Sequence, residues 1–193
     1  MPCQIKSKPK SKSQKAVEIA KDVVSRLRCK KLKIKQGNGY ILPIKDQVVT
    51  LNMDISLQPQ VELLESKCEV CALGSMLLSY VRLFNNVESV DRVDEYDFDF
   101  IFEKLSDVFP KNTLVIIEGV FEGTLINEEL LFNDYYSSKN KLKISQIEKR
   151  ILKFRKKVFA RCKQRGKKAK AEAVLSAICR NIIRNKGKFI LPE

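Results

Sequence analysis

Residues 145–187, which read SQIEKRILKFRKKVFARCKQRGKKAKAEAVLSAICRNIIRNKG, decide the fold class. Apolar residues recur there every three or four positions, the spacing of one helix face. The first set is Ile147, Ile151, Phe154, Val158 and Cys162, and the second is Ala171, Val174, Leu175, Ile178 and Ile182. Gly166 lies between the sets and Gly187 follows the second, where a helix is expected to stop. The stretch therefore predicts a basic helical hairpin over residues 145–186.

The two helices of this hairpin have different boundary signals. Ser145 and Glu148 have the spacing of a capping box, in which the two side chains satisfy the first free amides of a helix. We therefore expect the first helix to begin at Ser145 and to end at Gln164-Arg-Gly166. The second helix is expected over about residues 168–185.

The turn of the hairpin carries the strongest functional signal. Ten cationic side chains crowd around it, and excess positive charge raises affinity for phosphate groups. The predicted nucleic-acid-binding residues are Lys153, Arg155, Lys156, Lys157, Arg161, Lys163, Arg165, Lys167, Lys168 and Lys170. A secondary basic arm is expected to help them through Lys6, Lys8, Lys10, Lys12 and Lys15. No RNP motif, GxxG loop or recognition-helix pattern accompanies these residues, so the predicted binding is independent of base sequence.

Outward from the hairpin, the pattern predicts one mainly α domain over residues 13–193, preceded by a basic, disordered N-terminal arm over residues 1–12. Further helices are expected at about residues 13–29, 59–84 and 92–109, the last capped by Ser89 or Asp91 and ended by Pro110. Residues 114–122 are rich in β-branched side chains, which favour a strand. Glu118 and Glu122 are four residues apart, however, so we favour a helix, capped by Asn112 or Thr113.

A small β-hairpin is the one expected departure from helix. Residues 32–43 alternate in polarity and contain Asn38-Gly39, a dipeptide that supplies the positive φ angles of a type I′ turn. A second extended run at residues 47–51 is expected to add to this hairpin.

Charge is segregated along the chain of 193 residues, whose net charge is +14. Residues 1–37 carry +10 (12 Lys/Arg, 2 Asp/Glu), residues 38–136 carry −12 (6 and 18), and residues 137–193 carry +16 (19 and 3). One interpretation is a basic surface for nucleic acid. The alternatives are that the basic ends fold back on the acidic middle, or that they bind an acidic lipid surface or an acidic protein.

Several classes of activity are disfavoured by residue counts. The chain has no His, which removes Ser-His-Asp triads, Cys/His zinc fingers and the commonest general base. The acids between Asp91 and Asp99 fit a helix start better than a Mg²⁺ site. Asp54 with Glu65-Ser-Lys67 has the order of a nuclease set, but Glu65 falls in a predicted helix rather than a strand. We expect no enzyme, no cofactor and no metal.

The six cysteines, Cys3, Cys29, Cys68, Cys71, Cys162 and Cys179, are expected to be thiols, most of them buried. Cys68 and Cys71 lack the two further ligands of a zinc site, so we predict that they pack on one face of a helix. No signal peptide follows the basic N-terminus, and the apolar run from Val70 to Leu83 is too short to span a membrane. An intracellular, cytoplasmic location without membrane contact is expected.

Two segments resemble small uncharacterised proteins of bacteriophages and prophages. One is Cys68-Glu-Val-Cys-Ala-Leu-Gly-Ser-Met-Leu-Leu-Ser, similar to their Cys-x-Ala-x-Gly-Ala-like helix, although Ser75 stands where Ala is expected. The other is the ending Asn181-Ile-Ile-Arg-Asn-Lys-Gly-Lys-Phe189, similar to their Asn-Ile-Ile-x-Asn-x-Gly-x-Phe tail. The resemblance covers about a fifth of the chain, brings no catalytic residue, and implies a viral accessory protein.

Three functions remain open. The first is a non-enzymatic binder of RNA or DNA, acting on phosphates in any sequence. The second is a protein-interaction module, such as a viral inhibitor of a host protein. The third is a binder of an anionic nucleotide.

Overall fold

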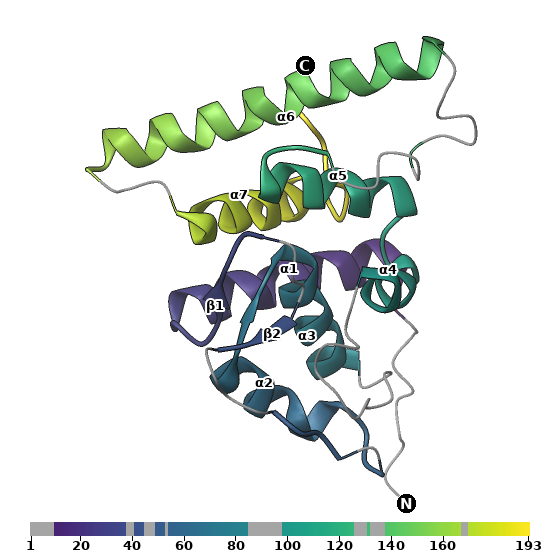
Figure 1. Cartoon of the computed structure of the whole chain (residues 1–193), viewed down its shortest axis with the longest axis vertical. Coiled ribbons are helices and arrows are strands. Elements are labelled where there is room, and N and C mark those ends of the chain that lie inside the picture. The colour runs from purple at the N-terminus through teal and green to yellow at the C-terminus, as the bar shows by residue number, and fades with distance from the viewer. Residues whose placement is uncertain are drawn as a thin grey trace, which may run out of the picture.

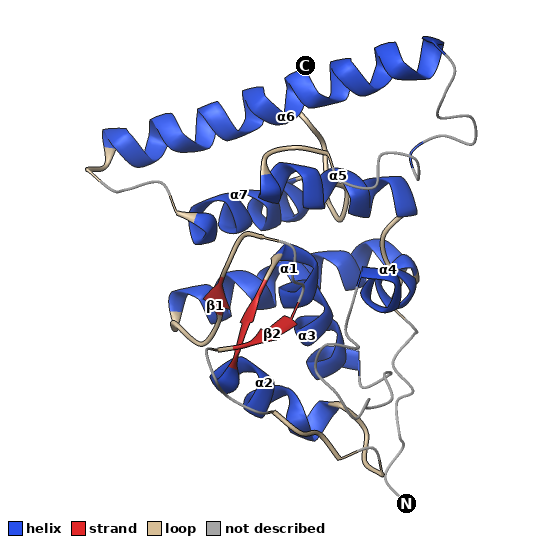
Figure 2. Cartoon of the chain, viewed as in Figure 1, coloured by secondary structure: helices blue, strands red, loops and turns tan. Residues whose placement is uncertain are grey.

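Helices make up most of the computed structural model, which describes residues 10–37, 41–44, 49–52, 54–84, 98–125, 131, 138–166 and 170–193 (Figures 1 and 2). The α-helices are α1 (Lys12–Arg28), α2 (Val61–Lys67), α3 (Ala72–Phe84), α4 (Phe98–Ser106), α5 (Lys111–Glu122), α6 (Ser138–Gln164) and α7 (Ala171–Arg184). A 3₁₀-helix, η1 (Gln58–Gln60), precedes α2. The short strands are β1 (Lys33–Ile34), β2 (Ile41–Pro43) and β3 (Cys68–Val70). The predicted mainly α fold with a small β element near the N-terminus is confirmed.

The helices pack in layers (Figure 1). The long helix α6 lies across one end of the molecule and packs on α5 and α7. Beneath these two helices, α7 packs on α1 and α5 packs on α3 and α4. One continuous cluster of buried apolar side chains joins all of these layers.

The innermost helix is α3, whose residues 72–81 are all buried. Its small residues Ala72, Gly74 and Ser75 let neighbouring helices approach, and α1, α4 and α5 all pack against it. A helix that is apolar on every side is stable only when it is covered on every side.

The first helix, α1, is fixed at both its start and its buried face. The Ser11 Oγ accepts a hydrogen bond from the Gln14 amide, and the Gln14 side chain accepts one from the Ser11 amide, a capping box that begins the helix. Ala16, Ile19, Ala20 and Val23 are buried against α3 and α7. Ser11 and Lys12 of the predicted arm thus belong to this helix and its cap, while residues 1–9 lie outside the described residues.

The C-terminal end of α7 meets the start of α1 at Gly187. Its φ is +95°, which side chains rarely adopt. A Cβ placed on Gly187 would lie 2.5 Å from the Ser13 carbonyl oxygen and 2.8 Å from the Ser13 Cα. Glycine is therefore required here both by backbone conformation and by the close approach of the two segments.

The predicted β-hairpin is wrong in its pairing. The strands β1 and β2 both pair with β3, in the order β1-β3-β2, with β1 parallel and β2 antiparallel to β3. Val70 of β3 pairs with Ile34 on one side and Ile41 on the other, so three apolar residues gather over the core. A two-stranded hairpin has little to bury by itself, and insertion of β3 supplies the missing apolar partner. Asn38-Gly39 lies outside the described residues.

The helix predicted over residues 59–84 is also corrected, because β3 divides it into α2 and α3. Cys68 lies in this strand and Cys71 follows it, so the two thiols are not on one helix face. Both are nonetheless buried free thiols, as their packing role requires. Val49 and Leu51 of the predicted run 47–51 are buried, but the described residues of that run do not join the three-stranded sheet.

Two helix starts differ from their predicted caps. Helix α6 begins at Ser138, so Ser145 lies inside the helix and is not its cap. Helix α5 is a helix as predicted, but it begins at Lys111 after Pro110, without a side-chain cap from Asn112 or Thr113. The start predicted near Ser89 or Asp91 lies outside the described residues. The ends predicted at Gln164 and before Gly187 are confirmed.

A cluster of four charged side chains joins α1, α2 and α3. Glu65 of α2, whose side chain is 4% exposed, accepts hydrogen bonds from Arg26 Nε at 2.9 Å and Arg82 Nη1 at 2.7 Å. Arg82 also pairs with Asp22. Burial, together with the nearby Arg82, lowers the pKa of Arg26. Glu65 is therefore a structural counter-ion, and it lies in a helix, α2, as the sequence predicts.

Replacement of Glu65 by Gln is expected to destabilise the fold by about 3 kcal/mol, because Arg26 and Arg82 would lose the carboxylate that both of them contact, leaving Asp22 and the nearby Glu62 as counter-ions in a half-buried site. Urea unfolding followed by circular dichroism measures the loss. The matched control is Glu18→Gln, which removes the exposed ion pair of Glu18 with Lys10 (2.7 Å) and should cost less than about 1 kcal/mol. Equal losses in the two variants would contradict a structural role for the Glu65 cluster.

The Gly187→Ala variant is expected to lose roughly 3 kcal/mol of stability, because the added Cβ meets the Ser13 backbone and the φ is unfavourable. The control is Gly166→Ala, where φ is +63° but no other described residue comes within 4 Å of the added Cβ. That change should cost only about 1 kcal/mol. Similar unfolding midpoints for the two variants would show that the contact with Ser13 is unimportant.

Candidate nucleic-acid interface

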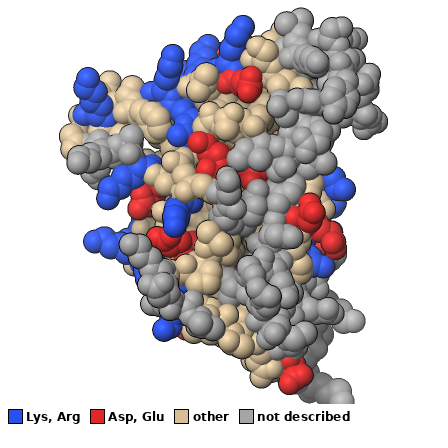
Figure 3. Space-filling model, in the orientation of Figure 1, with Lys and Arg blue, Asp and Glu red and all other residues tan. Residues whose placement is uncertain are grey.

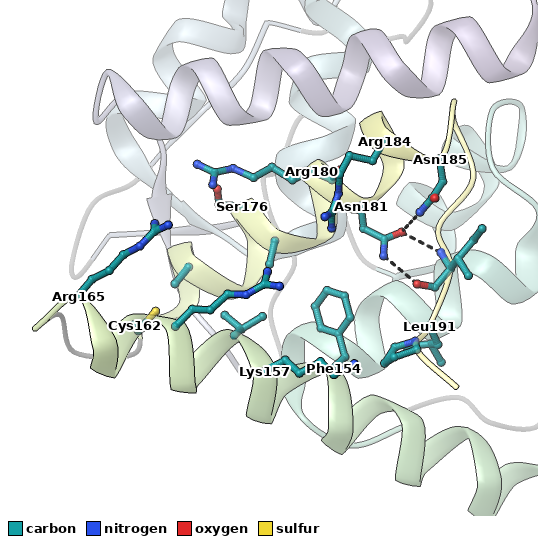
Figure 4. Close-up of a pocket in the computed structure, with 16 residues that line it drawn as sticks. Phe154, Lys157, Cys162, Arg165, Ser176, Arg180, Asn181, Arg184, Asn185 and Leu191 are labelled. Carbon is teal, nitrogen blue, oxygen red and sulfur yellow. Dashed lines mark hydrogen bonds between the residues drawn. The ribbon is translucent and has the colours of Figure 1, made fainter.

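A groove of 500 Å³ lies between α6 and α7 and is closed at one end by the C-terminal residues (Figure 4). We call it the α6–α7 groove. Among the described residues, five cationic side chains line it, namely Lys157, Arg161, Arg165, Arg180 and Arg184. Lys157 and Arg161 are four residues apart on α6, Arg165 lies in the turn just after that helix, and Arg180 and Arg184 are four residues apart on α7. Positions four apart share one face of a helix, so both helices present cations to the same groove.

The remaining lining of the groove is largely apolar. Phe154, Val158 and Cys162 come from α6, and Ala173 and Ala177 come from α7. The C-terminal tail adds Ile190, Leu191 and Pro192. The ring of Phe154 is held edge-on by Phe189, with centroids 5.7 Å apart.

The tail that closes the groove is fixed by side chains of both helices. Asn181 of α7 donates to the Ile190 carbonyl at 2.8 Å and accepts from the Ile190 amide at 2.9 Å. Arg150 of α6 donates to the carbonyls of Leu191 (3.0 Å) and Pro192 (2.9 Å). These bonds explain why Asn181 is buried although it is polar, and they hold the groove in one shape.

The cations of the groove have no counter-ion among the described residues. No Asp or Glu is among the side chains that line it, and the described part of the chain forms no ion pair with these five residues. In Figure 3, Lys and Arg side chains gather along the edge formed by α6. Such a concentration of one sign of charge attracts anions.

The ten residues predicted from the sequence fall into different places. Lys157, Arg161 and Arg165 line the groove. Lys156, Lys163 and Lys170 are exposed outside it, and Lys153 is exposed but contacts the Glu193 carbonyl. Lys167 and Lys168 lie outside the described residues.

Arg155 has a structural role that its sequence context does not indicate. Its guanidinium donates to the carbonyls of Val120, at 2.8 Å, and Phe121, both at the C-terminal end of α5. The group also lies over the Phe159 ring, 5.3 Å from its centroid. Burial lowers the pKa of Arg155, and the nearby Glu122 opposes this effect. A cation at a helix C-terminus satisfies free carbonyls and complements the helix dipole, so Arg155 fastens α6 to α5.

Two lysines of the basic arm also contact side chains of the folded domain. Lys10 pairs with Glu18 at 2.7 Å, and both Lys10 and Lys15 lie over the Phe84 ring, at 5.7 and 5.3 Å. Lys12 is exposed, whereas Lys6 and Lys8 lie outside the described residues. None of the arm's described lysines lines the α6–α7 groove.

Arg180 and Arg184 are the site residues that sequence reasoning missed. They lie in a helix of low charge density, so no cluster of cations draws attention to them. Their spacing of four was a usable signal, because it places both on one side of α7. Which side faces α6 depends on how α7 packs on α1.

Other candidate sites are less well supported. Among the described residues, no group of three His, Cys, Asp or Glu side chains is placed to hold a metal ion. Burial raises the pKa of Cys68 to about 11 and that of Cys71 to about 12, and it also raises the pKa of Cys179. These thiols stay protonated near neutral pH and are poor nucleophiles. In the described part of the chain, no helix combines the length and apolar character needed to cross a bilayer.

Comparisons with known proteins add no relative: no family model, no curated protein and no solved structure matches this chain. The resemblance to bacteriophage proteins stays a prediction.

The Arg155→Gln variant is expected to lower the free energy of unfolding by about 2 kcal/mol, because two carbonyls of α5 lose a charged donor. Lys156→Gln is the matched control, since Lys156 is the exposed neighbour and should change stability by less than about 0.5 kcal/mol. Thermal or urea unfolding of both variants measures the difference. Indistinguishable stabilities would mean that Arg155 is free to serve as a ligand.

Proposed function

We propose that this protein binds nucleic acid through phosphate contacts made by the α6–α7 hairpin, without reading base sequence and without catalysis. The observation that carries the proposal is the α6–α7 groove, where five Lys and Arg side chains converge without a carboxylate among the described lining residues. Exposed Lys156, Lys163 and Lys170 extend this positive surface beyond the groove. Arg side chains suit phosphate oxygens because their planar fork donates two parallel hydrogen bonds.

Some cations bind groups of the protein itself, whereas others line the groove. This division supports the proposed nucleic-acid binding over the alternative in which the basic ends are neutralised by the acidic middle of the chain. Cations that the fold uses contact carbonyls or carboxylates, as Arg155, Arg150 and Arg26 do. Among the described residues, the groove cations make no ion pair with a carboxylate, and of them only Arg184 donates to a backbone carbonyl, that of Arg180 at 3.3 Å within its own helix. Arginines that converge without a counter-ion repel one another, and a bound polyanion would relieve that repulsion.

Independence of base sequence follows from the shape of the surface. A helix that reads bases enters the major groove with its polar face exposed and unobstructed. Here the groove-lining sides of α6 and α7 face each other across a shared groove, so the cations of the groove cannot enter the major groove on either helix. Backbone contacts alone give affinity and position but no sequence information.

The proposal predicts binding that weakens steeply with salt. Fluorescence anisotropy of labelled RNA and DNA oligonucleotides should show log K falling linearly with log salt, with a slope that counts the phosphates contacted. Reversal of Lys156, Lys157 and Arg161 to Glu should weaken binding by more than about tenfold and reduce the slope by about three.

A control variant carries the same change in net charge on another surface. Lys30, Lys31 and Lys67 are exposed and do not line the α6–α7 groove: Lys67 ends α2, and Lys30 and Lys31 lie beside Glu62 and Ser66 of that helix. Their reversal to Glu should leave the slope nearly unchanged. Equal losses from the two triple variants would indicate a nonspecific effect of net charge, and absence of binding at low salt would reject the proposal.

A further inference from the structure

The α6–α7 groove has the dimensions of a binding site for a linear polymer rather than of a pocket for one small anion. Its α7 side runs from Ala173 to Arg184, about 16 Å along the helix axis. Lys157 and Arg161 are four residues apart on α6, or about 6 Å along its axis, and Arg165 lies in the turn beyond the helix, so the three spread along the groove instead of surrounding one point. Figure 4 shows Arg165 near one end and Leu191 at the other.

The floor of the groove is lined by apolar side chains, which can contact the bases of a single strand but not those of a duplex. Phe154, Val158, Ala177 and Ile190 present apolar atoms between the two cationic rims, and Ile190 is 50% exposed. In a duplex the faces of the bases are hidden in the stack and only phosphates meet a protein surface of this kind. In a single strand the bases are free to turn toward apolar side chains while the phosphates stay with the cations.

We infer that the α6–α7 groove binds one single strand of RNA or DNA, with its phosphates along the Lys and Arg rims and its bases against the apolar floor. The inference rests on the proposed function and narrows it to a substrate class. Duplexes then bind more weakly, through the outer cationic face of α6 alone.

Two sets of substitutions separate the groove from the outer face. The groove set is Lys157→Gln, Arg161→Gln and Arg180→Gln. The outer set is Lys149→Gln, Lys156→Gln and Lys163→Gln, three exposed lysines seven residues apart on one face of α6, none of which lines the groove. Both sets remove three positive charges, and circular dichroism checks that both variants fold.

Binding is measured with an unstructured pyrimidine 12-mer, as DNA and as RNA, and with a 12-base-pair duplex. We expect the single strands to bind the unmodified protein at least about tenfold more tightly than the duplex. The groove set should weaken single-strand binding at least tenfold and duplex binding less than threefold. The outer set should weaken duplex binding at least tenfold and single-strand binding less than threefold.

The contact with bases has its own control, an abasic 12-mer with the same phosphates. It should bind several-fold more weakly than the pyrimidine strand, and equal affinity would overturn the placement of bases on the floor. In a Cys3→Ser, Cys29→Ser variant, the single strand should slow alkylation of Cys162, which lines the groove, and the duplex should not.

The outcomes distinguish the two proposals. Binding of the duplex as tightly as the single strand, or equal losses for both in the groove set, would overturn the single-strand inference and leave phosphate binding standing. Failure of every oligonucleotide to bind at low salt would overturn both.

Discussion

The packing of α7 against α1 is the contact on which the other features depend. It joins the two ends of the chain, since the turn after α7 lies against the first turn of α1 at Gly187 and Ser13. With α7 held there, one side of that helix faces the core and the other faces α6. The tail beyond Gly187 is then directed back over α6, where Arg150 and Asn181 hold it. Close backbone contact fixes orientation more firmly than side-chain burial alone, because rigid backbone atoms have little room to adjust.

Positive charge in this protein serves two purposes that the sequence does not separate. Arg26, Arg150 and Arg155 hold elements together by donating to carboxylates or to backbone carbonyls. Among the described residues, the groove cations do not join two elements in this way, since their one such contact, from Arg184 Nε to the Arg180 carbonyl at 3.3 Å, lies within α7. Arg161 of the groove and Arg155 nonetheless belong to the same run of basic residues in α6. A cation used in the fold is oriented and partly dehydrated, and it has fewer donors left for phosphate. Only the remaining cations are candidates for ligand binding.

Sequence predictions that depend on interactions between residues close in the chain were confirmed more often than those that depend on residues far apart in the chain. Helices α1, α6 and α7 were predicted, because apolar spacing over three or four turns is a local signal, and α5 was predicted from the spacing of Glu118 and Glu122, which is also local. The small sheet was mispredicted: β3 has three residues, too few for an alternating pattern, and its partners β1 and β2 lie about 30 residues earlier. The cap predicted at Ser145 was wrong because a capping box can also occur inside a longer helix. Of the candidate site, the α6 half was predicted and the α7 half was missed.

The sequence by itself determined a mainly α chain, a basic amphipathic hairpin at its C-terminal end, and the apolar positions that face the core. These properties follow from local periodicity and composition, which each segment carries wherever it packs. Only the tertiary structure decided that β3 joins β1 and β2, that Arg155 is bound to α5, and that Arg180 and Arg184 face the same groove as Arg161. Each of these depends on two segments distant in the chain meeting in one orientation, and that orientation is set by packing around the shared core rather than by either segment alone.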